Sequence, residues 1–170
     1  MFGAVRHRLP LTFALAVLAL GTLVSFDTAA QDAAEPERKA DGSIQFRLAL
    51  DNSPLELDYR PEQTITPAVA EFQKTGQNPY RGDPKAIAAG KTVWQKWCRA
   101  CHLDDGTGRI GPNLVDGQVH YRRVATDVGQ FEVIYAGGAG AMQAFGKRVD
   151  QDTILAVMAY LAELQAAAGN

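Results

Sequence analysis

Cysteine and histidine are scarce in this chain of 170 residues, which contains two cysteines and three histidines. Two cysteines are too few for a disulfide scaffold or for a metal site built from four thiolates. The chain also lacks an excess of basic residues: 17 Lys and Arg against 19 Asp and Glu argue against a nucleic-acid binder. No internal repeat is present, and no long apolar run follows the first thirty residues. A composition of 46% apolar and 21% charged residues excludes wholesale disorder.

The first thirty residues predict a secretory signal peptide. Two arginines precede an almost uninterrupted apolar run from Leu9 to Phe26, and the run ends in Asp-Thr-Ala-Ala at 27–30. Small residues at this point suit a signal peptidase, so residues 1–30 are expected to be removed and the protein to be exported to the periplasm. The alternative is an uncleaved membrane anchor, because the run is near the lower length limit for a transmembrane helix.

The remaining chain divides into three stretches. Residues 31–43 are polar and charged, which predicts a disordered lead-in. Residues 44–82 predict an N-terminal extension that combines a β-hairpin, with apolar and polar side chains alternating on either side of a turn, and a short helix over about 67–75. Residues 83–166 predict the main helical domain.

Three helices are expected in that domain. Asp83 and Pro84 form a cap-plus-proline start, and the helix that they open runs directly into Cys98. A second helix is expected over Asp127 to Ala136. Asp150 or Asp152 caps the last one. Its apolar stripe, at spacings of three and four, consists of Ile154, Val157, Met158, Leu161 and Leu164.

The chemistry is concentrated in Cys98-Arg99-Ala100-Cys101-His102. Two thiols three residues apart at a helix end reach the two vinyl groups on one edge of a haem and form thioethers, while His102 lies beneath the iron. Other readings explain less. A thioredoxin-like thiol pair needs a βαβ context, a zinc site needs four ligands, and a Cys98–Cys101 disulfide leaves the histidine without a role. The pentapeptide therefore predicts one covalently bound haem c.

A low-spin electron carrier needs a sixth iron ligand, for which Met142, Met158, His120 and the lysines are candidates. Met158 lies on the apolar face of the last helix, which favours core packing. His120 follows a Gly-Pro loop closely, which favours a surface or supporting position. Met142 lies among small residues in a loop that can approach a flat macrocycle. We therefore predict His102 and Met142 as the axial pair, which raises the haem potential; the alternative is that Met142 is a loop residue without a role.

Two further residues are candidates for supporting the haem. A ligating histidine normally donates its other ring N–H to a carbonyl, and the Pro112 carbonyl is the expected acceptor. Arg109 is a candidate for pairing with a haem propionate through charge-assisted hydrogen bonds. The alternative for Arg109 is a solvated surface arginine.

The order of helix, Cys-x-x-Cys-His, Gly-Pro-Asn-Leu, methionine loop and closing helix resembles class I cytochrome c over Asp83 to Leu164. In that fold the first and last helices cross at a contact between a glycine and aromatic residues. The resemblance implies an all-α class I cytochrome c fold around one covalently bound haem, here with a small N-terminal β-hairpin extension. It places the crossing at Gly90, Trp94, Val157, Tyr160 and Leu161.

Longer stretches are similar to the cytochrome c-L family, the periplasmic electron acceptors of quinoprotein methanol dehydrogenases. The resemblance covers roughly Phe46 to Leu164. The family's usual Trp-x-Tyr after the Gly-Pro loop is replaced by Val119-His120-Tyr121. The matching runs are Thr75-Gly76-Gln77-Asn78-Pro79-Tyr80, Gly108-Arg109-Ile110-Gly111-Pro112-Asn113-Leu114, Asp127-Val128-Gly129-Gln130-Phe131-Glu132 and Gly137-Gly138-Ala139-Gly140-Ala141-Met142.

This resemblance implies a one-electron carrier and not an enzyme. The implied donor is a pyrroloquinoline quinone (PQQ) methanol or alcohol dehydrogenase, the lanthanide-dependent type included, and the implied acceptor is another cytochrome or an oxidase. Neither nucleic acid nor stable membrane insertion after signal cleavage is expected. The alternatives are a shuttle for another periplasmic dehydrogenase or reductase, and a haem enzyme or gas sensor, which needs an open sixth position on the iron.

Surface charge offers one hypothesis about docking. A slightly acidic surface attracts a basic patch on the donor and steers the encounter. Asp104 and Asp105 directly follow the haem histidine and are the first candidates for this role. The alternative is that they are solvated loop residues.

Overall fold

The computed structural model describes residues 35–119 and 121–169. The expected signal peptide at 1–30, the start of the expected lead-in and His120 lie outside the described residues. Where the chain is described, none of the helices has the length and apolarity needed to span a bilayer.

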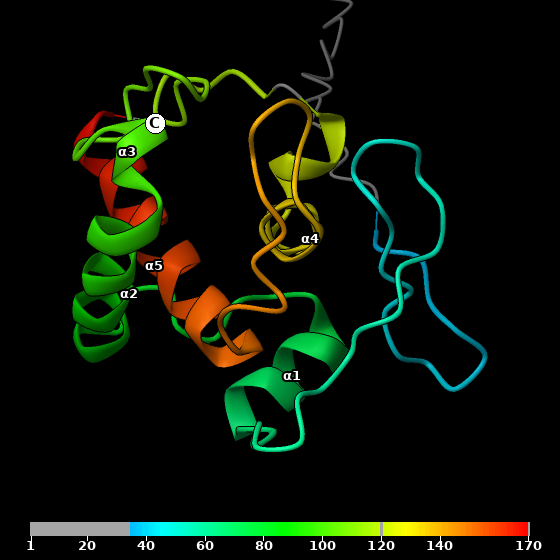
Figure 1. The fold of residues 1–170 in the computed structure, drawn as a ribbon. Helices are drawn as coiled ribbons and strands as arrows, with labels where there is room; N and C mark the ends of the chain where they lie inside the picture. Colours follow the sequence, from blue (N-terminus) through cyan, green and yellow to red (C-terminus); the bar gives the residue numbers. More distant parts are fainter. Residues whose placement is uncertain (1–34, 120, 170) are drawn as a thin grey trace, which may run out of the picture. The chain divides into compact units, whose positions relative to one another are not determined.

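The described chain is helical, which confirms the all-α expectation (Figure 1). The helices expected from cap and glycine signals are all present, and two short ones, α3 and η1, join them. In chain order the elements are α1 (Pro67–Thr75), α2 (Pro84–Trp97), α3 (Arg99–His102), the 3-10 helix η1 (Arg122–Ala125), α4 (Asp127–Ala136) and α5 (Gln151–Ala167).

The helices begin where short polar side chains satisfy free backbone N–H groups. Thr66, Asp83 and Asp150 each accept a hydrogen bond from a backbone N–H in the first turn of the helix that follows. Of the two candidates for the last helix, Asp150 is therefore the cap. Asp152 instead accepts hydrogen bonds from the side chains of Thr66 and Tyr80, which ties α5 to the start of α1.

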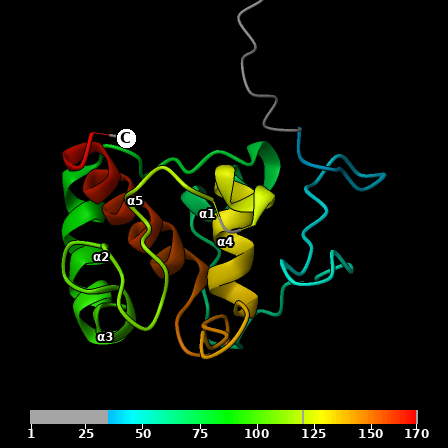
Figure 2. The same cartoon turned by 90° about the horizontal axis from the view of Figure 1, so that it is seen from above.

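The crossing of α2 and α5 is the most extensive contact between helices in the described chain (Figures 1 and 2). Gly90 allows the close approach, because a Cβ there would lie 2.0 Å from the carbonyl oxygen of Ala156. Next to it, Trp94 is 2% exposed, and its ring packs edge-on against Tyr160 with 5.8 Å between centroids. The Gly–aromatic contact implied by the resemblance is thus present, and it fixes the end of α2 that carries the Cys-x-x-Cys-His motif.

A second core joins the N-terminal extension to the helices. Phe46, Phe72 and Phe131 form a cluster with ring centroids 4.9–5.9 Å apart. Ile154 and Met158 of α5 belong to the same buried cluster, and Met158 is 1% exposed. The core position expected for Met158 is therefore correct.

The expected β-hairpin is not shown as a pair of strands. The chain does turn back on itself: Leu48 N donates to Ser53 O at 2.8 Å, and Leu55 N donates to Phe46 O at 2.8 Å. However, the described extension contains only isolated bridges, between Arg38 and Ile44 and between Arg47 and Pro54. Pro54 has no N–H to donate, so a ladder cannot continue through it.

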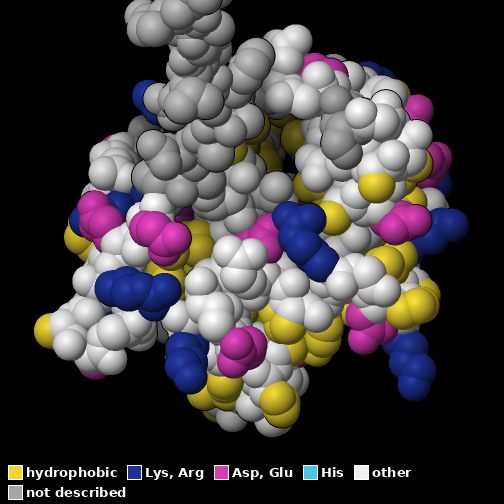
Figure 3. Space-filling model, turned by 180° about the vertical axis from the view of Figure 1, so that it is seen from behind, with side chains coloured by type: hydrophobic (Ala, Val, Ile, Leu, Met, Phe, Trp, Pro, Cys, Tyr) yellow, Lys and Arg dark blue, Asp and Glu magenta, His cyan; other side chains and the backbone are white. Residues whose placement is uncertain are grey.

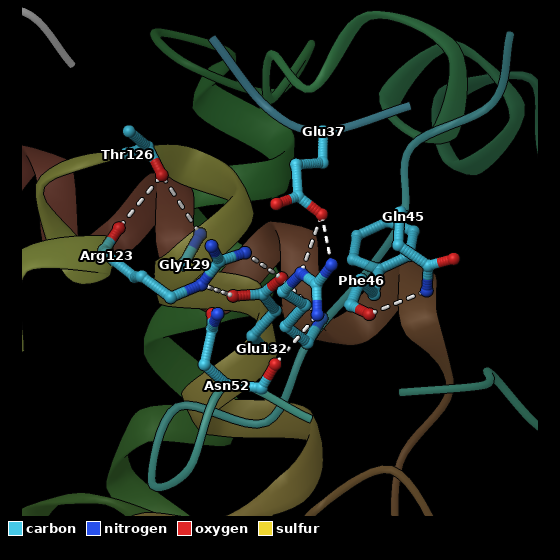
Figure 4. Close-up of polar contacts among 9 residues, drawn as sticks. Glu37, Gln45, Phe46, Asn52, Arg123, Thr126, Gly129 and Glu132 are labelled. Carbon is cyan, nitrogen blue, oxygen red and sulfur yellow. Dashed lines mark hydrogen bonds and ion pairs between the residues drawn. The ribbon is translucent and has the colours of Figure 1, made fainter. Parts of the chain in front are cut away.

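A buried carboxylate anchors this extension to the helical domain (Figure 4). Glu132 of α4 is fully buried, and Arg123 of η1 donates to its two oxygens at 2.7 and 2.6 Å. The backbone N–H of Arg47 donates to the same carboxylate at 2.7 Å, and the Arg47 side chain pairs with Glu37. The hydrogen bonds with Glu132 raise the pKa of Arg123, so its guanidinium stays charged. We call Glu132, Arg123 and Arg47 the Glu132 clamp.

Candidate haem site

The Cys-x-x-Cys-His motif lies where α2 ends and α3 begins. Cys98 follows the last turn of α2, and the backbone N–H groups of Cys101 and His102 both donate to its carbonyl, at 3.1 and 3.0 Å. This tight turn places both thiols and the imidazole along the walls of one cavity region. Neither cysteine forms a disulfide, and both are half-buried.

The His102 imidazole is fixed by its neighbours. Its Nδ1 lies 3.1 Å from the carbonyl oxygen of Pro112. Because a carbonyl only accepts, Nδ1 carries the hydrogen and Nε2 keeps a free lone pair, as a metal-binding histidine requires. Gly111 packs directly on the ring: a Cβ there would lie 2.4 Å from Cε1 of His102. The expected contact between His102 and Pro112 is thus present in the structure.

Two adjoining cavities, with empty volumes of about 1040 and 1000 Å³, meet at this motif. Cys98, His102 and Met142 line both of them. The wall of the first cavity is mostly apolar, and α2, α4 and α5 contribute to it with side chains such as Ile134 and Val157. These volumes include solvent at the mouths of the cavities, because both cavities are open on one side. Apolar walls, two thiols and an imidazole with a free nitrogen fit a covalently held haem.

Met142 lies in the loop between α4 and α5, where two contacts hold the loop in place. The backbone N–H of Gly138 donates to the Met142 carbonyl at 3.3 Å, and the hydroxyl of Tyr121 accepts from the backbone N–H of Ala139 at 2.9 Å. The structure thus brings Met142 and His102 into the walls of the same cavities, whereas Met158 lines neither of the two.

Arg109 lies on the α3 side of the site. Its Nη2 donates to the Ala100 carbonyl at 2.9 Å, and its backbone N–H donates to the Cys101 carbonyl at 2.9 Å. These bonds hold the loop after the histidine against α3. A pairing of Arg109 with a haem propionate stays a prediction.

The two candidate docking carboxylates have partners within the chain. Asp104 lies 3.5 Å from the Arg99 guanidinium and accepts a hydrogen bond from Gln95 at 3.1 Å. Asp105 accepts from the hydroxyl and the backbone N–H of Thr107, and these bonds lower the pKa of its carboxyl group.

Burial also affects the thiol chemistry of the motif. It raises the pKa of Cys98 to about 11, and the charge of Cys101 adds to this effect. Cys98 is therefore a neutral thiol near pH 7 and not a reactive thiolate. Within the described residues no three His, Cys, Asp or Glu side chains gather to hold a metal ion.

Sequence reasoning missed much of the cavity walls, and Trp97 and Tyr121 stand out because they line both cavities. Trp97, for which the sequence predicted no role, lies beside Cys98 in both. Tyr121 also lines both, in addition to its contact with the methionine loop. The available signals were the position of Trp97 directly before the first cysteine and the match of Tyr121 to the tyrosine of Trp-x-Tyr.

The helical fold, the Cys-x-x-Cys-His turn and the cavity with a methionine in its wall define a c-type cytochrome. Among known proteins, the family model described as cytochrome c oxidase, cbb3-type, subunit III, matches residues 85–161. Cytochrome c-L of Methylorubrum extorquens is 30% identical over 132 residues, which cover 77% of this chain and 67% of that protein. The CcoP subunit of a cbb3-type cytochrome c oxidase from Azospirillum is 33% identical over 89 residues, 48% of this chain and 30% of that protein.

Solved structures of cytochromes c-L are also similar to this chain. Cytochrome c-L from Methylophaga aminisulfidivorans matches with a TM-score of 0.68 and 33% identity over 71% of this chain and 80% of the other. Cytochrome c-L from Hyphomicrobium denitrificans matches with a TM-score of 0.67 and 30% identity over 71% and 73% of the two chains. The chain belongs to the cytochrome c-L family, and it is an electron-transfer protein and not an enzyme.

Proposed function

We propose that this protein is a periplasmic carrier of single electrons with one covalently bound haem c. The observation that carries the proposal is the shared cavity: both thiols, the imidazole of His102 and the thioether of Met142 lie in its walls. When bound, the haem supplies a one-electron Fe(III)/Fe(II) couple.

Each residue of the site then has a role. Cys98 and Cys101 form the thioethers, and His102 and Met142 are the axial ligands of the iron. The Pro112 carbonyl holds the His102 ring in the tautomer that leaves Nε2 free. Arg109 pairs with a propionate. These assignments are part of the proposal.

The chain organisation proposed with it follows the sequence. Residues 1–30 form a cleaved signal peptide that directs the protein to the periplasm. Residues 31–43 form the lead-in, 44–82 the extension, and 83–166 the cytochrome c domain. The Glu132 clamp supports this arrangement, because it holds the extension to α4 and η1 without entering the cavity walls.

The proposed donor is a PQQ-dependent methanol or alcohol dehydrogenase, the lanthanide-dependent type included. Membership of the cytochrome c-L family supports this choice. The proposed acceptor is another cytochrome or an oxidase, and the similarity to an oxidase subunit that carries a cytochrome domain supports it. A shuttle for a different periplasmic dehydrogenase or reductase is the second candidate, because the cavity itself does not select a donor.

Stopped-flow reduction tests the donor. The oxidised protein is mixed with methanol dehydrogenase and methanol, and the haem absorbance is followed. We expect rapid reduction with methanol and none when methanol is omitted. Reduction by a different periplasmic dehydrogenase, with no response to methanol dehydrogenase, would replace the donor while keeping the carrier. A protein that binds carbon monoxide in its native reduced state would instead be a haem enzyme or sensor.

A further inference from the structure

The surface beside the first cysteine combines an aromatic ring with unpaired positive charge. Trp97 lines both cavities next to Cys98 and remains half-exposed. The Nζ of Lys96 lies 5.0 Å from the centroid of the Trp97 ring, and the guanidinium carbon of Arg148 lies 5.7 Å from it. The ring of Phe145 contacts Trp97 edge-on at 6.2 Å between centroids. We call Lys96, Trp97, Phe145 and Arg148 the Trp97 patch.

The two cations of the Trp97 patch have no carboxylate partner. Six basic side chains in the described chain do form ion pairs: Lys39, Arg47, Arg60, Arg81, Arg99 and Arg123. Lys96 and Arg148 are exposed and belong to no such pair among the described residues, and neither does their neighbour Lys147. The patch is therefore locally positive on a chain whose formal net charge is −2.

The Trp97 ring holds these charges at a fixed place. A cation over an aromatic face is attracted to it, which limits the freedom of long basic side chains. Because the same ring forms part of the cavity wall, the charges lie at an edge of the proposed haem site. Basic and acidic side chains are interspersed on the face seen in Figure 3, and the carboxylate of Asp104 is paired with Arg99.

We infer that the Trp97 patch is a docking surface for a redox partner that presents carboxylates there. The inference rests on the proposed electron-carrier function and adds to it the place of docking and the charge of the partner. Charges of opposite sign at a redox edge steer the encounter, and their effect falls as salt rises. Phe145 and Trp97 supply the apolar contact, and Lys96 and Arg148 supply the attraction.

The rate of oxidation by an anionic oxidant depends on the charge at this edge of the site. Hexacyanoferrate(III) takes one electron from the reduced cytochrome and becomes hexacyanoferrate(II), while the cytochrome becomes ferric. Wild type is compared with a double variant, Lys96→Gln and Arg148→Gln. The control is a second double variant, Lys74→Gln with Lys85→Gln, which changes the net charge by the same amount. Both lysines are exposed: Lys74 lies on α1, and Lys85 lies at the start of α2, about 18 Å along that helix from Trp97.

We expect the oxidation rate of wild type and of the control to fall as salt rises. The patch variant should be slower at low salt, on the order of tenfold, and should converge with the others at high salt. Polyglutamate, as a probe for an acidic protein surface, should shift the NMR signal of the Trp97 indole N–H in wild type and in the control, but not in the patch variant. Equal rates and equal shifts in the two double variants would overturn the inference.

Two measurements on wild type distinguish a failure of the proposed function from a failure of the docking inference. Covalent haem and the weak near-infrared band of methionine ligation are measured first in wild type. A wild type that lacks either one refutes the proposed site. A wild type with both, together with identical behaviour of the two double variants, refutes only the docking surface.

Discussion

The His102 imidazole is constrained on two sides. The Pro112 carbonyl accepts from Nδ1 at 3.1 Å, and the backbone of Gly111 packs on the carbon between the two ring nitrogens. A hydrogen bond at Nδ1 makes the imidazole a stronger donor at Nε2, and a fixed ring orientation sets the overlap with the metal. These two neighbours would therefore set how His102 presents its nitrogen to the iron of the proposed haem.

Gly111→Ala tests this constraint. A Cβ at Gly111 would lie 2.4 Å from Cε1 of His102, so the ring or the loop must move. We expect a loss of about 1–3 kcal/mol in the free energy of unfolding, as for other overpacked sites, together with a changed haem spectrum. Gly42→Ala is the control: its φ of +84° costs about 1–2 kcal/mol, but a Cβ there meets nothing within 4 Å in the described structure. Equal spectra for both variants and wild type would contradict the role of Gly111.

The two buried or half-buried methionines make opposite predictions. Met142→Ala should abolish the near-infrared band of methionine ligation, lower the potential and open the iron to cyanide or carbon monoxide. Met158→Ala should keep the band and cost about 2–5 kcal/mol of stability, because Met158 is 1% exposed in the core. Spectra and thermal unfolding of both variants check this. A band that survives in the Met142 variant would assign the ligand to another residue.

The helices follow local signals closely. Short polar caps, prolines in the first turn and glycines at the ends are all contained within a few residues, so the sequence alone predicts α1, α2, α4 and α5. The same holds for the His102–Pro112 contact, which spans ten residues. The hairpin is different: the structure pairs Arg47 with Pro54, which was expected in the turn, and Pro54 cannot donate to a ladder.

The contacts that sequence reasoning missed are those between distant segments. The Arg47 backbone reaches Glu132 across 85 residues, and Tyr121 reaches the methionine loop across 18. No local pattern distinguishes a buried glutamate in α4 from a solvated one, since amphipathic spacing concerns apolar side chains. Likewise, the position of Trp97 in the cavity wall depends on how the loop with Phe145 folds back on α2.

Glu132→Gln tests how strongly the Glu132 clamp holds these segments together. The change keeps the shape but leaves Arg123 without its counter-charge. Because the Arg123 side chain is 31% exposed, the loss should be smaller than for breaking a fully buried pair, which costs about 3–5 kcal/mol, and larger than for a surface pair. The control is Glu56→Gln, which breaks the exposed pair with Lys39 and should cost about 0–1 kcal/mol. Chemical denaturation of both variants measures the difference. Similar losses in the two would mean that the clamp contributes no more than a surface ion pair.

The cavity of the proposed site is lined by side chains of α2, α4 and α5, so a haem bound there would form part of the core. Protein interiors are close-packed, and a void of this kind would remove contacts from α2, α4 and α5 at once. We expect wild type to keep its haem through acid-acetone extraction, because thioethers are covalent. Cys98→Ala combined with Cys101→Ala should give no stable holoprotein, as judged by absorbance and circular dichroism. Extraction of the haem from wild type would refute covalent attachment.

The charge distribution over the whole molecule offers two docking hypotheses of opposite sign. Neutralising Asp104 and Asp105 to Asn removes acidic charge beside the haem histidine, whereas the Trp97 patch attracts acidic partners. If the two aspartates steer the proposed donor, their double variant should be reduced by methanol dehydrogenase more slowly at low salt and at the wild-type rate at high salt, where charges are screened within a Debye length of ~8 Å or less. Because the guanidinium of Arg99 offsets the charge of Asp104, which among the described residues leaves only Asp105 of the two without a counter-charge beside it, we expect nearly equal rates for the double variant and wild type at both salt concentrations. A slower variant at low salt only would return these carboxylates to the docking surface and place the donor on the acidic side of the molecule.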